Sequence, residues 1–185
     1  DPEMDGVYSF YLQPSIAVGI PTDEYDFTFV AADSLGATAE FTQSVFLENT
    51  PPVIDWVDTD PTGDLTIPDL GEIAEVRVMA EIFDPQGPED IDTAYYNYRR
   101  PDGTWDSYMM TDNGLEFDLD AYVSNPFTPY QGDSIAGDGI YTGMKLYNSL
   151  ADSGLHYFHI HALDKAGNEA DSVSTTLWIH PQPQH

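Results

Sequence analysis

The pattern of apolar and polar residues along this chain has a period of two in several segments. Residues 75–82 place Val76, Val78, Ala80 and Ile82 on one face and mostly polar side chains on the other. Residues 115–120, 158–162 and 173–179 alternate in the same way. This period predicts β-strands with one buried face. No segment shows a convincing helical period, so we expect an all-β fold.

Turn residues separate these strands. Residues 95–99 and 105–110 flank a Pro101-Asp102-Gly103 sequence, which predicts a hairpin. Short strands with Gly, Pro and Asp between them are typical of an antiparallel sandwich. The apolar faces predict a core for residues 51–180 that contains Val76, Val78, Ile82, Phe117, Leu119, Phe158, Ile160 and Leu177.

The chain also contains an internal repeat. Residues 25–39 (YDFTFVAADSLGATA) align with residues 156–170 (HYFHIHALDKAGNEA), placing Asp33 on Asp164 and Gly36 on Gly167. Residues 5–9 match residues 138–142, and residues 45–47 fall opposite residues 176–178. A period of about 130 residues predicts successive modules rather than a solenoid.

The repeat predicts the domain boundaries. Residues 1–49 correspond to the C-terminal part of a first module, residues 50–180 to a complete second module, and residues 181–185 to a tail. The sequence Glu48-Asn49-Thr50-Pro51-Pro52 predicts a short, stiff joint between the modules. An incomplete first module would expose strand edges, which favours pairing with a neighbouring module or with a second copy of the chain.

Three local sequences resemble bacterial immunoglobulin-like and fibronectin-III-like modules of secreted and cell-surface proteins. They are residues 49–54 (NTPPVI), 132–142 (GDSIAGDGIYT) and 162–168 (ALDKAGN). The resemblance implies tandem immunoglobulin-like sandwiches, the first one truncated, in an extracellular or cell-surface protein. It also implies a spacer, adhesion or carbohydrate-associated role.

Composition excludes several partners and sites. Asp and Glu total 33 against five Lys and Arg, a formal net charge of -28, which repels phosphate backbones and anionic lipid. No apolar run reaches the roughly 20 residues that span a bilayer, so we expect neither nucleic-acid binding nor membrane insertion. The absence of Cys excludes disulfides. No nucleophile elbow, HExxH motif or P-loop is present, so we predict no enzymatic activity and no catalytic residues.

Calcium is the cofactor that the acidic loops suggest, because it binds carboxylate and carbonyl oxygens on bending loops. Asp133 and Asp138 are the first choice, in a glycine-rich bend, and Asp58, Asp60 and Asp64 are the second. Asp84, Glu89, Asp90 and Asp92 form a third candidate stretch around Pro85-Gln86-Gly87-Pro88. The alternative for each loop is that Asp and Gly only form turns. Asp33 and Asp164 recur at equivalent hairpins, so we interpret both as turn residues.

Two further groups suggest binding. His159 and His161 share one strand face, but no third zinc ligand is evident, so we interpret this as an ordinary exposed face. The predicted hairpin carries Tyr95, Tyr98, Trp105 and Tyr108, whose exposed rings would stack on a glycan or contact a protein. The favoured function is therefore a non-catalytic structural, spacer or adhesion segment, stabilised by calcium. The alternative is a carbohydrate-binding accessory module of a secreted hydrolase.

Overall fold

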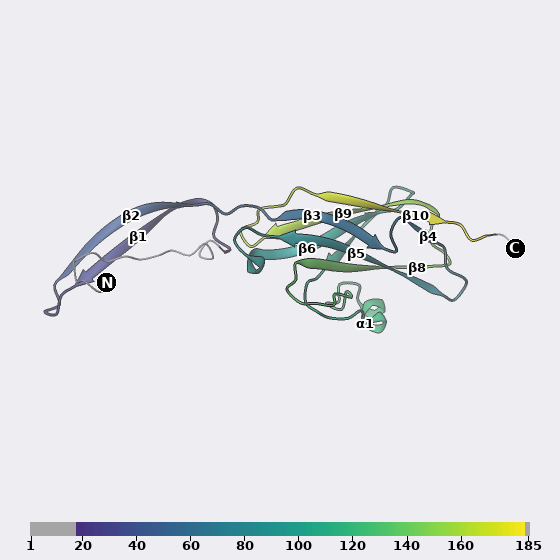
Figure 1. Cartoon of the computed structure of the whole chain (residues 1–185), viewed down its shortest axis with the longest axis horizontal. Coiled ribbons are helices and arrows are strands. Elements are labelled where there is room, and N and C mark those ends of the chain that lie inside the picture. The colour runs from purple at the N-terminus through teal and green to yellow at the C-terminus, as the bar shows by residue number, and fades with distance from the viewer. Residues whose placement is uncertain (1–17, 184–185) are drawn as a thin grey trace.

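Two β-sheets pack face to face in the computed structural model, which describes residues 18–183 (Figure 1). One sheet has the order β3-β5-β8, formed by β3 (Val53–Asp60), β5 (Ile73–Phe83) and β8 (Ile140–Asn148). The other has the order β4-β10-β9-β6-β7, formed by β4 (Asp64–Thr66), β10 (Val173–His180), β9 (Gly154–Asp164), β6 (Ile91–Arg99) and β7 (Trp105–Met110). All neighbouring strands are antiparallel except β4 and β10. The predicted all-β sandwich is confirmed.

The alternating side chains of the central strands form the core. Val76, Val78 and Ala80 of β5 are fully buried, and so are Phe158 and Ile160 of β9. Six of the eight predicted core residues are buried: Val76, Val78, Ile82, Phe158, Ile160 and Leu177. A strand with one face on the partner sheet buries every second side chain, which is why the period of two identified them.

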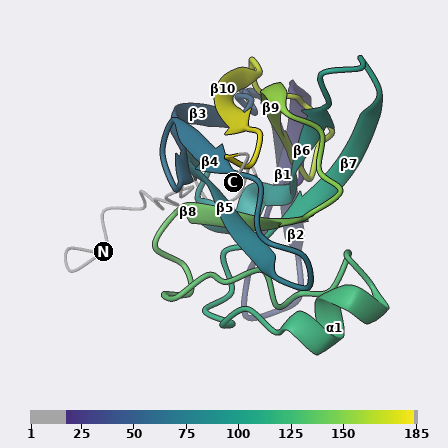
Figure 2. The same cartoon turned by 90° about the vertical axis from the view of Figure 1, so that its right-hand side faces the viewer.

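The other two predicted core residues lie in a segment that is not a strand. Residues 115–118 are irregular, and the short helix α1 (Leu119–Ser124) follows them below the three-stranded sheet (Figure 2). Asp118 caps this helix, because its side chain accepts a hydrogen bond from the Ala121 amide. Phe117 is only half-buried and Leu119 is 38% exposed. The prediction of a strand here was wrong, as was the absence of any helix, since alternation alone does not supply a partner strand.

A separate hairpin, β1 (Asp23–Ala32) and β2 (Thr38–Leu47), projects from one end of the sandwich (Figure 1). Its turn reproduces the β9–β10 turn. The Asp33 amide donates to the Ala37 carbonyl at 2.9 Å, and the Asp164 amide donates to the Asn168 carbonyl at 3.0 Å. Gly36 and Gly167 follow with φ of 86° and 87°, a left-handed conformation that favours glycine. The aligned turns therefore have the same backbone structure.

Strand register corrects one part of the repeat alignment. Tyr25 pairs with Val45 in the hairpin, and His156 pairs with Leu177 in the sandwich. Val45 is thus equivalent to Leu177 rather than to Thr176, because one extra residue lies after the second turn, between Ala170 and Val173. The predicted strand at residues 5–9 lies outside the described residues, and the division into two modules stays a prediction. No helix in the described part of the chain is long and apolar enough to cross a membrane.

Candidate metal centre

Three buried aspartates meet at the end of the sandwich that adjoins the hairpin. Asp84 follows β5, Asp90 ends the short 3-10 helix Pro88–Asp90, and Asp164 ends β9. Antiparallel pairing brings these ends together, since Ile91 of β6 pairs with Asp164. One carboxylate oxygen from each residue lies within 4.8 Å of the others. The three residues are 7%, 0% and 2% exposed, so the carboxylates lie in the protein interior. We call Asp84, Asp90 and Asp164 the aspartate cluster.

Hydrogen bonds hold the cluster in place. Asp164 accepts from both the amide and the side-chain Nδ2 of Asn168, each at 2.7 Å. Asp84 Oδ1 accepts from the Gln86 amide at 2.8 Å. The other oxygen, Asp84 Oδ2, is buried and has no hydrogen-bond partner. A buried carboxylate oxygen without a partner is costly, so it marks a position where a ligand would be favourable.

The cluster also lacks positive charge. None of its carboxylates forms an ion pair with a Lys, Arg or His side chain among residues 18–183. Burial raises the pKa of Asp84, the Gln86 amide opposes this shift, and the carboxylates of Asp90 and Asp164 raise the pKa further. Buried carboxylates without a counter-ion are unfavourable, and a bound cation would relieve this.

The donor set indicates which cation fits. All three ligands are carboxylates, and the neighbouring buried Asn49 adds a side-chain amide next to Asp90. No imidazole or thiolate belongs to the cluster, which disfavours zinc and copper. Oxygen donors in a loop-rich setting suit Ca²⁺, which takes six to eight of them. Asp84, Asp90 and Asp164 would hold the ion.

The first-choice metal residues from the sequence also lie close together. Asp133 and Asp138 form a group with Asp112, with ligand oxygens within 4.8 Å of one another. Backbone amides account for much of this geometry, because Asp112 accepts from Gly137 and Gly139 at 2.6 and 2.9 Å. Calcium at this loop remains a prediction, with a smaller driving force than at the aspartate cluster because Asp138 is exposed.

The second-choice residues do not form such a group. Among the described residues, Asp58, Asp60 and Asp64 are not brought together as potential ligands. Asp58 accepts from the Thr59 amide at 2.7 Å, and Asp64 contacts His180 Nε2 at 2.9 Å. Their spacing in the sequence spans the turn between β3 and β4, and a calcium site there stays a prediction.

Sequence reasoning noticed Asp84 and Asp90 but interpreted Asp164 only as a turn residue. That interpretation is incomplete, because Asp164 forms the turn and also completes the cluster. Its equivalent in the repeat, Asp33, forms the same turn but is exposed. Asn168 is the sequence signal that distinguishes Asp164 from Asp33. Its side chain donates a hydrogen bond to Asp164, whereas the equivalent position in the hairpin is Ala37.

The aromatic residues suggested for ligand binding lie in different environments. Trp105 is 51% exposed and lies beside His159, with the Arg99 guanidinium 5.7 Å from its ring centre. Tyr95 stacks on His161. Tyr98, in contrast, is buried in the core, and Tyr108 packs against it edge to face. Tyr98 and Tyr108 therefore do not form an exposed stacking surface.

The fold and the site together define a class: a two-sheet β-sandwich with a buried carboxylate cluster at the end where the linker enters. Comparison with protein-family models and with curated protein sequences gives no match. Among solved structures, the chain is similar to the PKD domain of an M14-like peptidase from Thermoplasmatales archaeon SCGC AB-540-F20, with a TM-score of 0.35 and 15% identity over 72% of this chain and 99% of that one. It is also similar to the sialic acid binding region of a Streptococcus sanguinis SK1 adhesin bound to 3'sLn, with a TM-score of 0.35 and 11% identity over 84% of this chain and 38% of that one.

Proposed function

We propose that this chain is a non-catalytic structural or adhesion segment of an extracellular protein, and that Ca²⁺ at the aspartate cluster stabilises it. The observation that carries the proposal is the unpartnered, buried Asp84 Oδ2 in a group of three carboxylates without a cationic neighbour. A divalent ion supplies the missing charge and binds the free oxygen. The proposal changes the expected site from the Asp133 loop to the sandwich end.

The cluster is joined to the linker between hairpin and sandwich. Asp90 accepts from the Gly19 amide at 2.6 Å and from Asn49 Nδ2 at 3.0 Å. Asn49 in turn exchanges two hydrogen bonds with the Thr22 hydroxyl, at 2.8 and 3.0 Å. A cation bound by Asp90 would stabilise these contacts, because it orients the carboxylate that receives them. Calcium would then limit the angle between the hairpin and the sandwich.

This arrangement suits a spacer outside the cell. Extracellular calcium modules commonly bind with Kd of roughly 10⁻⁴–10⁻³ M, which matches millimolar external calcium. A joint that stiffens when calcium is bound keeps successive modules extended. The -28 net charge would keep such a segment soluble and disfavour nucleic acid as a partner.

The direct test is calorimetric titration of the chain with Ca²⁺. We expect one site with Kd of roughly 10⁻⁴–10⁻³ M, lost in Asp84→Asn and kept in the matched variant Asp138→Asn. Binding that survives Asp84→Asn but disappears in Asp138→Asn would move the ion to the loop favoured by the sequence. If neither the wild type nor Asp138→Asn binds Ca²⁺ at concentrations up to 10 mM, the calcium proposal is refuted.

A further inference from the structure

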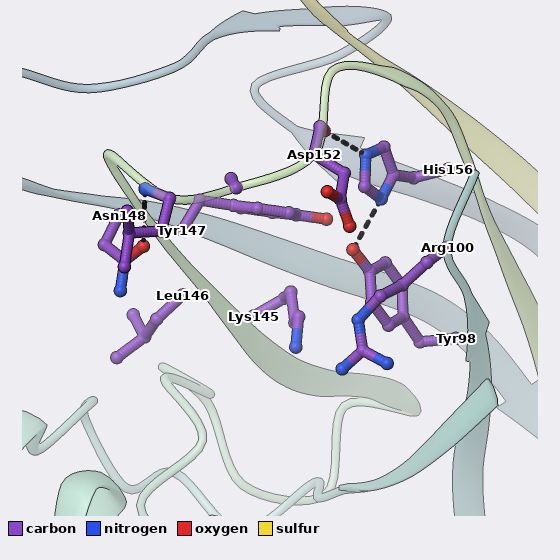
Figure 3. A pocket seen from close by; sticks show the side chains of 10 residues that line it. Tyr98, Arg100, Lys145, Leu146, Tyr147, Asn148, Asp152 and His156 are labelled. Atoms are coloured by element: carbon purple, nitrogen blue, oxygen red, sulfur yellow. Dashed lines mark hydrogen bonds between the residues drawn. The ribbon is translucent and has the colours of Figure 1, made fainter. Parts of the chain in front are cut away.

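A second feature lies at the opposite end of the sandwich. A cavity of about 150 Å³ opens between the two sheets there, lined by Tyr98 of β6, Lys145 and Tyr147 of β8, and His156 of β9 (Figure 3). Arg100 follows β6, and Asp152 lies in the loop between β8 and β9. Drug-sized ligands occupy pockets of roughly 300–1,000 Å³, so this cavity would admit one small group at the end of a larger ligand.

The cavity concentrates positive charge in a strongly acidic protein. The chain has five Lys and Arg residues, and two of them, Arg100 and Lys145, line this one cavity. The Lys145 ammonium lies 4.5 Å from the ring centre of Tyr98 and 4.3 Å from that of Tyr108. It also donates to the Tyr108 hydroxyl. Lys145 forms no ion pair with any carboxylate of residues 18–183, despite the excess of acids.

A half-buried ammonium without an anion is unfavourable, and the titration of Lys145 reflects this. Burial and, to a smaller extent, the neighbouring Arg100 guanidinium together lower the pKa of Lys145 to about 8, against the opposing charge of Asp106. Arg100 itself pairs with Asp106 and Thr104 and lies 5.6 Å from the Tyr98 ring centre. An anion in the cavity would stabilise both cations.

The other polar groups of the cavity suit a ligand that carries hydroxyl groups. The Tyr147 hydroxyl is buried beside the Tyr98 hydroxyl, and no hydrogen bond of good geometry satisfies it. Figure 3 shows it pointing to the same side of the cavity as the Asp152 carboxylate. His156 is held by two bonds, with Nε2 2.9 Å from the Asp152 carbonyl and Nδ1 2.5 Å from the Tyr98 hydroxyl. The carbonyl can only accept, so Nε2 carries the proton and the Tyr98 hydroxyl donates to Nδ1. A carboxylate such as Asp152 repels a plain anion but accepts hydrogen bonds from hydroxyls.

We infer that this cavity binds a sugar acid at the end of a glycan, with Arg100 and Lys145 facing its carboxylate and Tyr147 and Asp152 facing its hydroxyls. Arg100 is already paired with Asp106, so Lys145 is the cation that lacks an anion, and Asp152 is the carboxylate free to accept hydrogen bonds. This combination matches a ligand that carries both an anion and hydroxyl donors. Tyr98 and Tyr108, suggested from the sequence as exposed stacking rings, instead hold the Lys145 ammonium in position. The cavity lies far from the aspartate cluster, so this inference does not depend on calcium binding.

The test uses glucuronate as the probe, titrated into the full chain and followed by calorimetry and by NMR shifts of the Tyr and His side chains. Methyl glucuronate ester keeps the hydroxyls and lacks the charge, and acetate keeps the charge and lacks the hydroxyls. We expect saturable binding of glucuronate and at least tenfold weaker binding of both analogues. Arg100→Gln should weaken glucuronate binding at least tenfold, because Arg100 lies at the rim and its loss preserves the core.

Two controls separate this site from other effects. Lys165→Gln removes an exposed lysine elsewhere and should leave binding unchanged. Titrations in EDTA and with Asp84→Asn should also show unchanged binding, since sugar acids are themselves calcium ligands. Binding that requires calcium, equal binding of the ester, retention in Arg100→Gln, or no binding of glucuronate would each overturn the inference.

Discussion

Neutralising Asp84 is the sharpest perturbation of the aspartate cluster. In Asp84→Asn the amide oxygen still accepts from the Gln86 amide, and the new NH₂ group can donate to a neighbouring carboxylate in place of the unpartnered oxygen. The substitution is nearly isosteric, so the core around it is preserved. We expect the variant to be more stable than the wild type without calcium and unresponsive to calcium.

The magnitudes follow from the geometry. Two carboxylate charges within 4.8 Å of each other repel by at least about 3 kcal/mol at an effective dielectric constant of about 20. Hydrogen bonds to the carboxylates offset part of this repulsion, so we expect the free energy of unfolding of Asp84→Asn in EDTA to exceed that of the wild type by roughly 1–3 kcal/mol. For the wild type, calcium at a hundredfold excess over Kd adds about 2.7 kcal/mol. That free energy raises the Tm of a protein of this size by about 5–11 °C.

Thermal unfolding at matched ionic strength measures both effects. Wild type, Asp84→Asn and Asp138→Asn are melted in EDTA, in 10 mM Mg²⁺ and in 10 mM Ca²⁺, so that general screening is separated from specific binding. We expect a calcium-specific rise in the wild type and in Asp138→Asn. An equal rise with both ions, or a calcium rise retained in Asp84→Asn, would refute a calcium site at this cluster.

Four further predictions follow from single side chains. Without calcium, the folded protein binds a proton at Asp84 more readily than the unfolded chain does, because the pKa of Asp84 is raised. The wild type therefore loses free energy of unfolding as pH rises through that pKa. In urea titrations, the difference in free energy of unfolding between Asp84→Asn and wild type should shrink below pH 4. Gly143→Ala should lower the free energy of unfolding by roughly 1–3 kcal/mol, because a Cβ there would lie 2.8 Å from the Met109 carbonyl oxygen and from the Tyr96 ring. Gly103→Ala is the control: a Cβ there meets no atom, so this variant tests only the positive φ of the residue. Phe158→Ala should lose about 3–5 kcal/mol of unfolding free energy, since this ring is fully buried; a loss below 1 kcal/mol would contradict the core assignment. Because the pKa of Lys145 is lowered in the folded protein, the wild type loses free energy of unfolding as pH falls toward 8. As pH rises from 8 to 10, the wild type should therefore gain free energy of unfolding relative to Lys145→Met.

Local sequence determined the strands and turns of this protein. Alternation in residues 75–82 and 158–162 reports a face buried against a second sheet, and β5 and β9 follow it. The two Asp-x-x-Gly turns at Asp33 and Asp164 form identical backbone hydrogen bonds because turn chemistry depends on a few consecutive residues. Residues 115–120 show the limit, since the same alternation there leads into a capped helix.

Only the tertiary structure decided which polar residues form sites. Asp84, Asp90 and Asp164 come from three segments, and apart from Asn168 after Asp164 nothing in their local sequences distinguishes them from the many other acidic turn residues. Antiparallel pairing of β6 with β9 brings their ends together, and packing then removes them from water. The same holds for Arg100, which follows β6, and Lys145 of β8, because these strands belong to different sheets and meet only where the sheets pack face to face. Burial and proximity of charges depend on distant parts of the chain, which is why sequence alone predicted the fold better than the sites.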